Sequence, residues 1–224
     1  MSMMKKIIQT ILFIALFATL NIQTASAMSQ GPLPPDDSSS TPAAVPYVEG
    51  DIIFIQSQTT QAAALREATQ SAWTHVGIIV KNKSKWVVAE AIGPLKMTPI
   101  ADFIARSKNK SHKIMRFKHF DRKTMLKSLY TALPKYNKPY DIYFEFDQNR
   151  IYCSELTYLV FKEVTGFNYG RIQKMKDMRL DGPYAQALIK KRYTDTGREF
   201  DPEELIITPV SQVLDENSTL VYQK

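Results

Sequence analysis

The chain of 224 residues has one cysteine, three histidines and only eight glycines. A single thiol cannot form a disulfide within the chain, and the sequence has no Cys/His cluster with the spacing of a zinc site. It also has neither a glycine-rich phosphate-binding loop nor a dinucleotide fingerprint. We therefore expect no metal and no organic cofactor.

The positive charge is in modest excess, with 29 Lys and Arg residues against 22 Asp and Glu and a net charge of +7. The lysines are dispersed and form no basic stripe, so we expect no nucleic-acid partner. The excess of positive charge could attract the protein to an anionic cell wall or membrane surface, or it could belong to an ordinary solvated surface.

Residues 1–27 have the three parts of a secretory signal peptide. Lys5 and Lys6 supply a positive start, the apolar stretch 7–20 follows, and Ala-Ser-Ala at 25–27 has the small-x-small pattern that signal peptidase accepts. The apolar stretch is shorter than the roughly 20 residues that span a bilayer. We predict cleavage after Ala27, a periplasmic or secreted mature protein, and no stable membrane anchor after cleavage.

Residues 28–47 are rich in Pro and Ser and poor in large apolar side chains. Such a segment cannot bury enough apolar surface to order itself, so we predict a flexible linker. The remaining residues, 48–224, suit one domain with a hydrophobic core of its own.

Hydrophobic patterns in this domain predict a mixture of strands and helices. Apolar or alternating runs predict strands at 50–56, 74–80, 86–91 and 112–118, the second and third as partners in a hairpin. Helical spacing predicts helices at 121–136 and 153–166, the second ended by a glycine. Since the order lacks βαβ regularity, the predicted class is α+β.

Cys153 stands at the start of the second predicted helix, and both a helix N-terminus and a nearby imidazole lower the pKa of a cysteine thiol. Among the histidines, His75 begins a predicted strand. Glu90, in the otherwise apolar partner strand, is the best candidate to orient an imidazole.

Each of these three residues also has a purely structural interpretation. Cys153 is in phase with Leu156 and Val160, which is typical of a core thiol. A lone histidine is commonly structural, and Glu90 could lie on the exposed face of a half-buried strand.

The motifs "GDIIF", "THVGIIV", "VVAEAIG", "KPYDIYFEF" and "IYCSEL" occur in this order between residues 48 and 166. In this order they resemble the permuted papain-like amidases of the YiiX/YaeF-like group, relatives of the NlpC/P60 superfamily. The resemblance implies a circularly permuted papain-like fold, with an antiparallel sheet packed against helices that include the one carrying Cys153. In such permuted proteins the histidine strand precedes the cysteine helix, as it does here.

The resemblance implies Cys153 as nucleophile, His75 as general base and Glu90 as the orienting residue, with Tyr152, Tyr140 and Ser154 in the oxyanion and substrate pocket. It implies an exported cysteine amidase or peptidase that acts through a thioester, on cell-wall peptides or another amide substrate. A lipid-directed acyl hydrolase, thioesterase or acyltransferase on the same fold, and a binding module without catalysis, remain alternatives.

Overall fold

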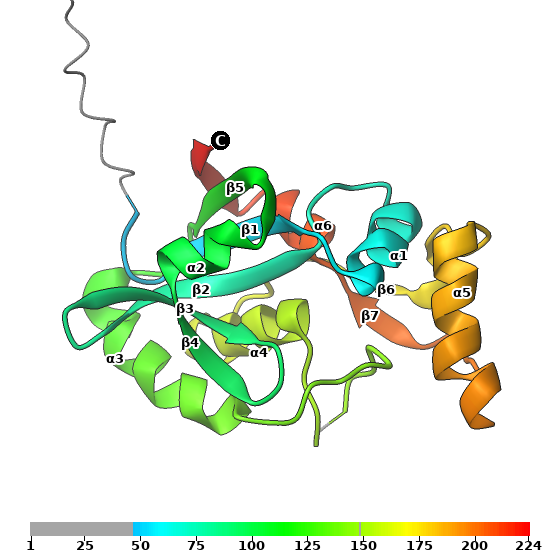
Figure 1. Ribbon diagram of the computed structural model, residues 1–224. Coiled ribbons are helices and arrows are strands. Elements are labelled where there is room, and N and C mark those ends of the chain that lie inside the picture. Colours follow the sequence, from blue (N-terminus) through cyan, green and yellow to red (C-terminus); the bar gives the residue numbers. More distant parts are fainter. Residues whose placement is uncertain (1–46, 148) are drawn as a thin grey trace, which may run out of the picture. The chain divides into compact units, whose positions relative to one another are not determined.

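The computed structural model describes residues 47–147 and 149–224 (Figure 1). The predicted signal peptide and almost all of the predicted linker lie outside these residues. Tyr47, assigned to the linker from the sequence, packs edge-on against Trp86 with ring centroids 5.1 Å apart, so it belongs to the folded part. No helix in the described part combines the length and apolarity that a bilayer crossing requires.

A six-stranded sheet forms the centre of the fold, in the order β4-β3-β2-β1-β5-β8, and every neighbouring pair is antiparallel. Its strands are β1 (Ile52–Ser57), β2 (His75–Asn82), β3 (Lys85–Ala91), β4 (Leu95–Pro99), β5 (Ser107–Phe117) and β8 (Ser218–Gln223). A separate antiparallel pair joins β6 (Ile172–Lys174) to β7 (Leu205–Ile207). The α+β class with an antiparallel sheet is confirmed.

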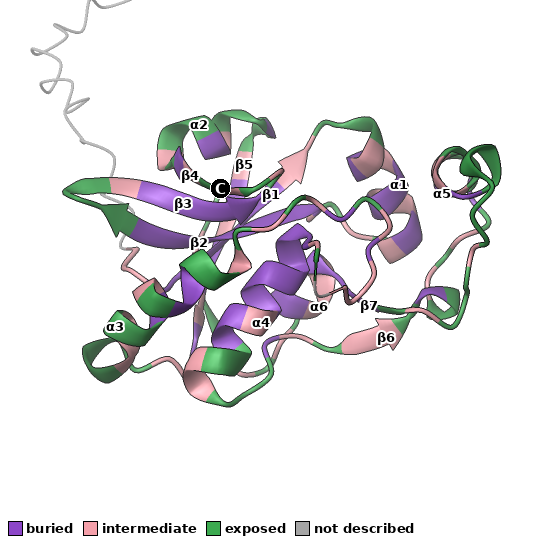
Figure 2. Ribbon diagram, turned by 90° about the horizontal axis from the view of Figure 1, so that it is seen from below, coloured by how far each residue is buried: buried purple, intermediate pink, exposed green. Residues whose placement is uncertain are grey.

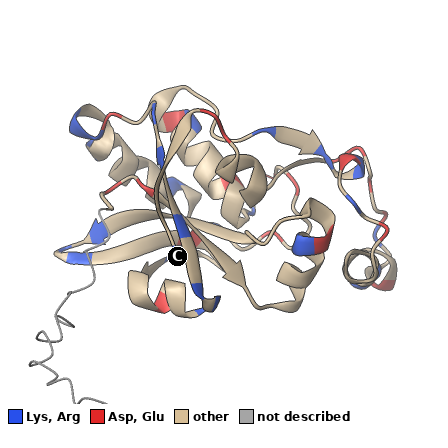
Figure 3. Cartoon of the chain, turned by 90° about the horizontal axis from the view of Figure 1, so that it is seen from above, with Lys and Arg blue, Asp and Glu red and all other residues tan. Residues whose placement is uncertain are grey.

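The helices are α1 (Thr60–Thr69), α2 (Ile100–Ala105), α3 (Arg122–Ala132), α4 (Cys153–Thr165), α5 (Pro183–Arg192) and α6 (Pro209–Val213). Short 3-10 helices are η1 (Leu133–Tyr136), η2 (Met175–Asp177) and η3 (Thr194–Thr196). The helix predicted from Cys153 is confirmed, and Gly166 ends it with a φ of +78°. Basic and acidic residues are spread over several of these elements in Figure 3.

The predicted hairpin of β2 and β3 is confirmed, with Ile78 opposite Ala89. Two differences concern the strands of this sheet. The strands β4 and β8 were not predicted, and β5 begins at Ser107 rather than at 112, within a polar stretch that the sequence marks as a loop. Ser107 is paired with Ser57 of β1, so a tertiary pairing decides the start of this strand where local composition does not.

Side chains from both faces of the sheet are buried, which explains why its central strands are continuous apolar runs. One face packs against α4, which is itself mostly buried (Figure 2). The other face packs against Phe103 of α2. The first cluster includes Ile52, Phe54, Val76, Ile78, Leu156, Val160 and Phe161; the second includes Ile53, Ile55, Ile79, Val88 and Ile114.

Candidate active site

Cys153 is the first residue of α4, and only 2% of it is exposed. It belongs to the apolar cluster between α4 and the sheet, as its phase with Leu156 and Val160 predicted. The thiol also interacts with the side chain of His75 and raises the pKa of that imidazole. Cys153 is therefore both a residue of the core and a partner of His75.

His75 is the first residue of β2 and is 9% exposed. Its Nε2 lies 2.6 Å from Oε2 of Glu90, in the neighbouring strand β3. Since Nε2 is bonded to the carboxylate, Nδ1 remains for the thiol of Cys153. The ring also stacks on Phe103, with centroids 5.5 Å apart, so its orientation is fixed from two sides.

Glu90 is fully buried, and three side chains neutralise or orient its carboxylate. Besides His75, Oγ1 of Thr98 donates to Oε1 at 2.5 Å, and Nη2 of Arg106 donates to both oxygens, at 2.7 and 2.6 Å. A buried carboxylate without such partners would be strongly unfavourable. Glu90 is therefore an interior partner of His75 and does not lie on an exposed edge.

These contacts shift the pKa values of His75 and Glu90 in the directions that favour the charged form of each. Burial opposes a charge on His75, but the negative charge and hydrogen bond of Cys153, together with Glu90, raise the pKa of His75 to about 9. Burial likewise opposes a charge on Glu90, but His75, Arg106 and Thr98 lower its pKa to about 2. The charged forms of both side chains, an imidazolium at His75 and a carboxylate at Glu90, are thus favoured near neutral pH.

The pKa of Glu155, in the first turn of α4, is raised, whereas that of Glu90 is lowered. Burial raises its pKa to about 8, although its carboxylate accepts the backbone N–H of Tyr152 at 3.3 Å. The side chain is therefore largely neutral at pH 7 and adds little negative charge beside Cys153. The positive end of the helix dipole at Cys153 is consequently little offset by Glu155.

The three residues predicted for the pocket lie near Cys153 in different ways. Tyr140 forms a bridge with Ile151, and the charge of Cys153 helps to raise the pKa of its hydroxyl, after burial itself. The hydroxyl of Tyr152 instead accepts the backbone N–H of Ile207 at 3.0 Å. The hydroxyl of Ser154 donates to the carbonyl of the same Ile207 at 2.9 Å. Tyr152 and Ser154 line a small cavity with Cys153, but their hydroxyls are bonded to β7.

A cleft of about 550 Å³ adjoins the site at His75. Its lining includes His75 and Tyr140, with Gln61 from α1 and Arg106 from the end of α2. Most of its remaining lining is contributed by β1, α1 and the residues between them. A molecule in this cleft therefore lies against both His75 and Tyr140, whereas Cys153 lines the smaller cavity.

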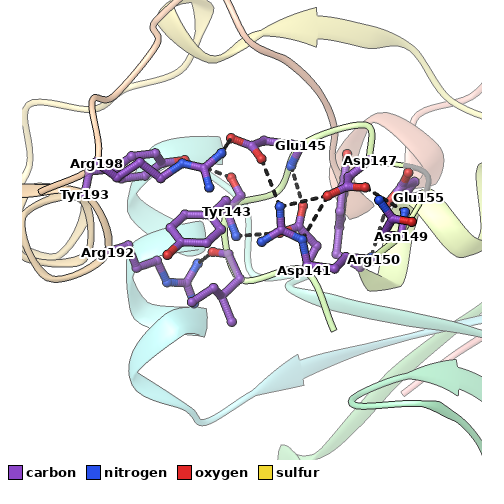
Figure 4. A network of polar contacts seen from close by, with 12 residues as sticks. Asp141, Tyr143, Glu145, Asp147, Asn149, Arg150, Glu155, Arg192, Tyr193 and Arg198 are labelled. Carbon is purple, nitrogen blue, oxygen red and sulfur yellow. Dashed lines mark hydrogen bonds and ion pairs between the residues drawn. The ribbon is translucent and has the colours of Figure 1, made fainter. Parts of the chain in front are cut away.

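The loop that leads to α4 is held by a network of charged residues (Figure 4). Arg150 contacts the carboxylates of Asp147 at 2.8 Å, Glu145 at 3.4 Å and Asp141 at 3.8 Å. Arg198 also donates to Glu145, from beyond η3. Arg198, in the segment after Gly166 to which no motif assigns a role, thus helps to hold the loop that precedes the cysteine.

Sequence analysis did not identify Thr98, Arg106, Gln61 or Arg192 as site residues. Thr98 and Arg106 reach Glu90 only because β4 pairs with β3 and α2 follows it directly. Arg192 is bonded to Gln61 across 131 positions of the sequence. No motif marks these residues, so only the folded chain reveals them.

Among the described residues, no group of three or more His, Cys, Asp and Glu side chains is arranged to hold a metal ion. Glu90 has both oxygens bonded to protein donors.

Comparison with known proteins gives the same grouping as the motifs. Residues 47–215 match the family described as "Permuted papain-like amidase enzyme, YaeF/YiiX, C92 family". The uncharacterized protein YiiX of Escherichia coli strain K12 is 34% identical over 161 residues, which are 71% of this chain and 78% of that protein. A crystal structure of YiiX from Escherichia coli O157:H7, described in its title as a metalloprotein, is 32% identical; the match covers 79% of this chain and 97% of that one, with a TM-score of 0.74.

Proposed function

Because the chain belongs to the family of permuted papain-like amidases, we propose that it is a cysteine amidase or peptidase with Cys153 as nucleophile, His75 as acid and base, and Glu90 as the orienting residue. One observation carries the proposal: the buried ring of His75 is bonded to the carboxylate of Glu90 at 2.6 Å, and Cys153 lies near enough to raise the pKa of His75. A nucleophile, a base and an orienting group in such a chain define a site for acyl transfer.

In the first half of the reaction the Cys153 thiolate attacks the carbonyl carbon of an amide, and the carbonyl π electrons move to oxygen. The His75 imidazolium then donates its proton to the amide nitrogen, the C–N bond breaks, and a thioester and a free amine result. In the second half neutral His75 removes a proton from water, whose oxygen attacks the thioester. Collapse releases a carboxylic acid and restores the thiolate and imidazolium.

The oxyanion that forms in each half requires donors within hydrogen-bond distance. The backbone N–H of Cys153 lies in the first turn of α4, where amides have no intrahelical acceptor. The hydroxyl of Tyr140 is the second donor that we assign to this role. Burial, and then the charge of Cys153, raise the pKa of Tyr140, so the hydroxyl keeps its proton at physiological pH.

A second candidate function, hydrolysis or transfer of a lipid acyl group, is favoured by a cavity beside the site. Its lining is almost wholly apolar and includes Met175, Leu188 and Phe200. The cavity shares Leu65, Phe144 and Ile206 with the small cavity at Cys153. An aliphatic chain bound there would place its carbonyl end toward the thiol.

The amidase proposal is tested first by the reactivity of the thiol. We expect iodoacetamide to label Cys153 of the native protein rapidly at pH 6–7, and His75→Ala to slow labelling about 100-fold, because the imidazole no longer supports the thiolate. Intact-mass spectrometry gives both rates. A wild-type protein that reacts only after denaturation would contradict the proposal.

The substrate class is tested by incubating wild type and Cys153→Ser with peptidoglycan fragments, and separately with N-acyl and acyl-ester lipids. Mass spectrometry then identifies products that only the wild type forms. Cleavage of an amide in the peptide fragments supports the leading proposal. Cleavage confined to the lipids replaces it with the second candidate.

Export is a further part of the proposal. Its support is the order of charged, apolar and small residues in the first 27 positions. Expression of the full chain in a Gram-negative host, followed by intact-mass analysis of the periplasmic fraction, should give a protein that begins at Met28. A full-length product that remains in the cytoplasm would contradict export.

A further inference from the structure

Two side chains outside the proposed triad form a chain of hydrogen bonds that ends at the hydroxyl of Tyr140. Nη2 of Arg192, the last residue of α5, donates to Oε1 of Gln61 at 2.5 Å. Nε2 of Gln61, in the first turn of α1, donates to the hydroxyl oxygen of Tyr140 at 2.8 Å. Helices α1 and α5, which are far apart in the sequence, thus meet beside Tyr140.

The direction of each hydrogen bond follows from the donors available. A guanidinium has donors only, so Arg192 can bond only to the carbonyl oxygen of the Gln61 amide. The amide nitrogen of Gln61 must then point toward Tyr140. Because this nitrogen is a donor, the hydroxyl oxygen of Tyr140 accepts, and the hydroxyl hydrogen is left to bond to another acceptor.

Arg192 is itself fixed in place. Its Nη1 donates to the carbonyl of Ile142, and its guanidinium lies over the ring of Phe144 at 5.0 Å. Both partners follow Tyr140 closely in sequence. The same arginine therefore holds the loop that carries Tyr140 and, through Gln61, the direction of its hydroxyl.

We propose that Gln61 and Arg192 are positioning residues, which turn the hydroxyl hydrogen of Tyr140 toward the oxyanion formed at Cys153. The inference rests on the proposed function and deepens it, since it assigns a catalytic contribution to α1 and to the C-terminal α5. A pre-oriented donor needs no reorganisation when charge develops on the substrate oxygen, and such donors contribute strongly to the rate.

Two reagents separate this role from a role in thiol activation. Acylation of Cys153 by p-nitrophenyl acetate passes through a tetrahedral oxyanion, whereas alkylation by iodoacetamide forms none. We expect Tyr140→Phe to lower the limiting acylation rate about 100-fold, and Gln61→Leu and Arg192→Met to lower it about tenfold. All three variants should alkylate at the rate of the wild type.

Double variants test whether the three residues act through one another. In the Tyr140→Phe background, Gln61→Leu and Arg192→Met should cause no further loss of acylation, because there is no hydroxyl left to orient. Additive losses would overturn the proposal. A variant that fails to fold would lose the fast alkylation as well and is recognised in that way; Gln61→Leu, which preserves volume, is then the decisive variant.

Arg198→Met is the matched control. Arg198 also anchors this loop, through Glu145 and the ring of Tyr143, but it is bonded to neither Gln61 nor Tyr140. We expect its acylation rate to match the wild type. An equal loss in Arg198→Met and Arg192→Met would overturn the proposal in favour of general loop anchoring.

The outcomes also separate this inference from the proposed function. A wild-type thiol inert to both reagents contradicts the cysteine-hydrolase proposal itself. Fast reaction with both reagents, together with unchanged acylation in Gln61→Leu and Arg192→Met, contradicts only the positioning role.

Discussion

Arg106 donates from a single nitrogen, Nη2, to both carboxylate oxygens of Glu90, at 2.7 and 2.6 Å. The carboxylate is fully buried, while 38% of the arginine side chain is exposed. Arg106 therefore provides a positive charge at the boundary between solvent and interior. After His75 itself, this contact is the next cause that lowers the pKa of Glu90, so it helps to keep the carboxylate ionised beside the imidazolium.

Replacement of Arg106 by Met should weaken the whole site. Glu90 would lose a charged partner, so its pKa should rise and its support of the His75 imidazolium should fall. We expect alkylation of Cys153 at pH 6 to slow about tenfold and the unfolding free energy to fall by about 1 kcal/mol, a value reduced for the exposure of the arginine. Iodoacetamide kinetics and urea titration measure the two effects.

Lys96→Met is the control for this prediction. Lys96 is the cross-strand partner of Glu90 in β4, yet it is exposed and is a cation of the same charge. Its replacement should change neither rate nor stability appreciably. If Arg106→Met behaves like Lys96→Met, the assigned role of Arg106 is wrong.

The proton on His75 should persist to unusually high pH. Its pKa of about 9 depends on the charge and hydrogen bond of Cys153 and on Glu90, which together outweigh burial. We expect NMR titration of the His75 ring to give a midpoint near 9, and Cys153→Ser to lower it by at least one pH unit because the thiolate is lost. An unchanged midpoint in Cys153→Ser would show that the thiol carries no charge.

This shift has a consequence for stability. The folded-state pKa lies above the ordinary value of 6.5, so the stabilisation from His75 is complete below pH 6.5 and is lost as the pH rises through about 9. Cleavage of amides should decline over the upper part of the same interval, because the imidazolium that protonates the leaving nitrogen disappears.

Glu155 should make the protein less stable as the pH rises, whereas an ordinary ion-paired carboxylate makes it more stable. Burial raises its pKa to about 8, so between pH 4.5 and 8 the folded state holds a proton that the unfolded state has released. Stability must then fall as the pH rises through this range. Glu155→Gln, which can still accept the N–H of Tyr152, should remove this pH dependence and be more stable than the wild type at pH 8.

Glu163→Gln on the same helix provides the comparison. Its carboxylate is partly exposed and bonded to Lys135, which lowers the pKa of Glu163. Neutralising it should cost less than about 1 kcal/mol and leave the pH dependence of unfolding in place. Denaturant titrations between pH 5 and 8 distinguish the two variants, and identical profiles for both would contradict the assignment to Glu155.

Gly77 should be required for the geometry of the site. A Cβ at this position would lie 2.4 Å from Cγ1 of Val88 and 2.9 Å from the backbone oxygen of Ala89. Gly77→Ala must therefore separate β2 from β3, the two strands that carry His75 and Glu90. We expect a loss of about 1–3 kcal/mol in unfolding free energy and slower alkylation of Cys153.

Gly93→Ala is the matched control, because a Cβ at Gly93 meets no atom within 4 Å. Its stability should lie within about 0.5 kcal/mol of the wild type. Thermal unfolding and iodoacetamide kinetics of the two alanine variants form a direct test. Equal stability of both would contradict the close strand approach.

Much of the fold follows from patterns that are local in the sequence. The hairpin of β2 and β3 and the helix from Cys153 to its terminal glycine each depend on neighbouring residues, so hydrophobic spacing and turn residues predict them. The order of the motifs also placed the chain in its family, and singled out Cys153, His75 and Glu90. The edge strands β4 and β8 lack such a signal, because their pairing depends on partners distant in sequence.

The residues that hold the site residues in place can be identified only from the tertiary structure. Thr98 and Arg106 are near Glu90 because β4 and α2 fold over β3, and Arg192 reaches Gln61 because α5 lies beside α1. The sequence by itself determined which residue types were available for acyl transfer. The partners that shift the pKa values of His75 and Glu90 against the effect of burial, and the hydrogen bonds that direct Tyr140, come together only when distant segments pack and exclude water.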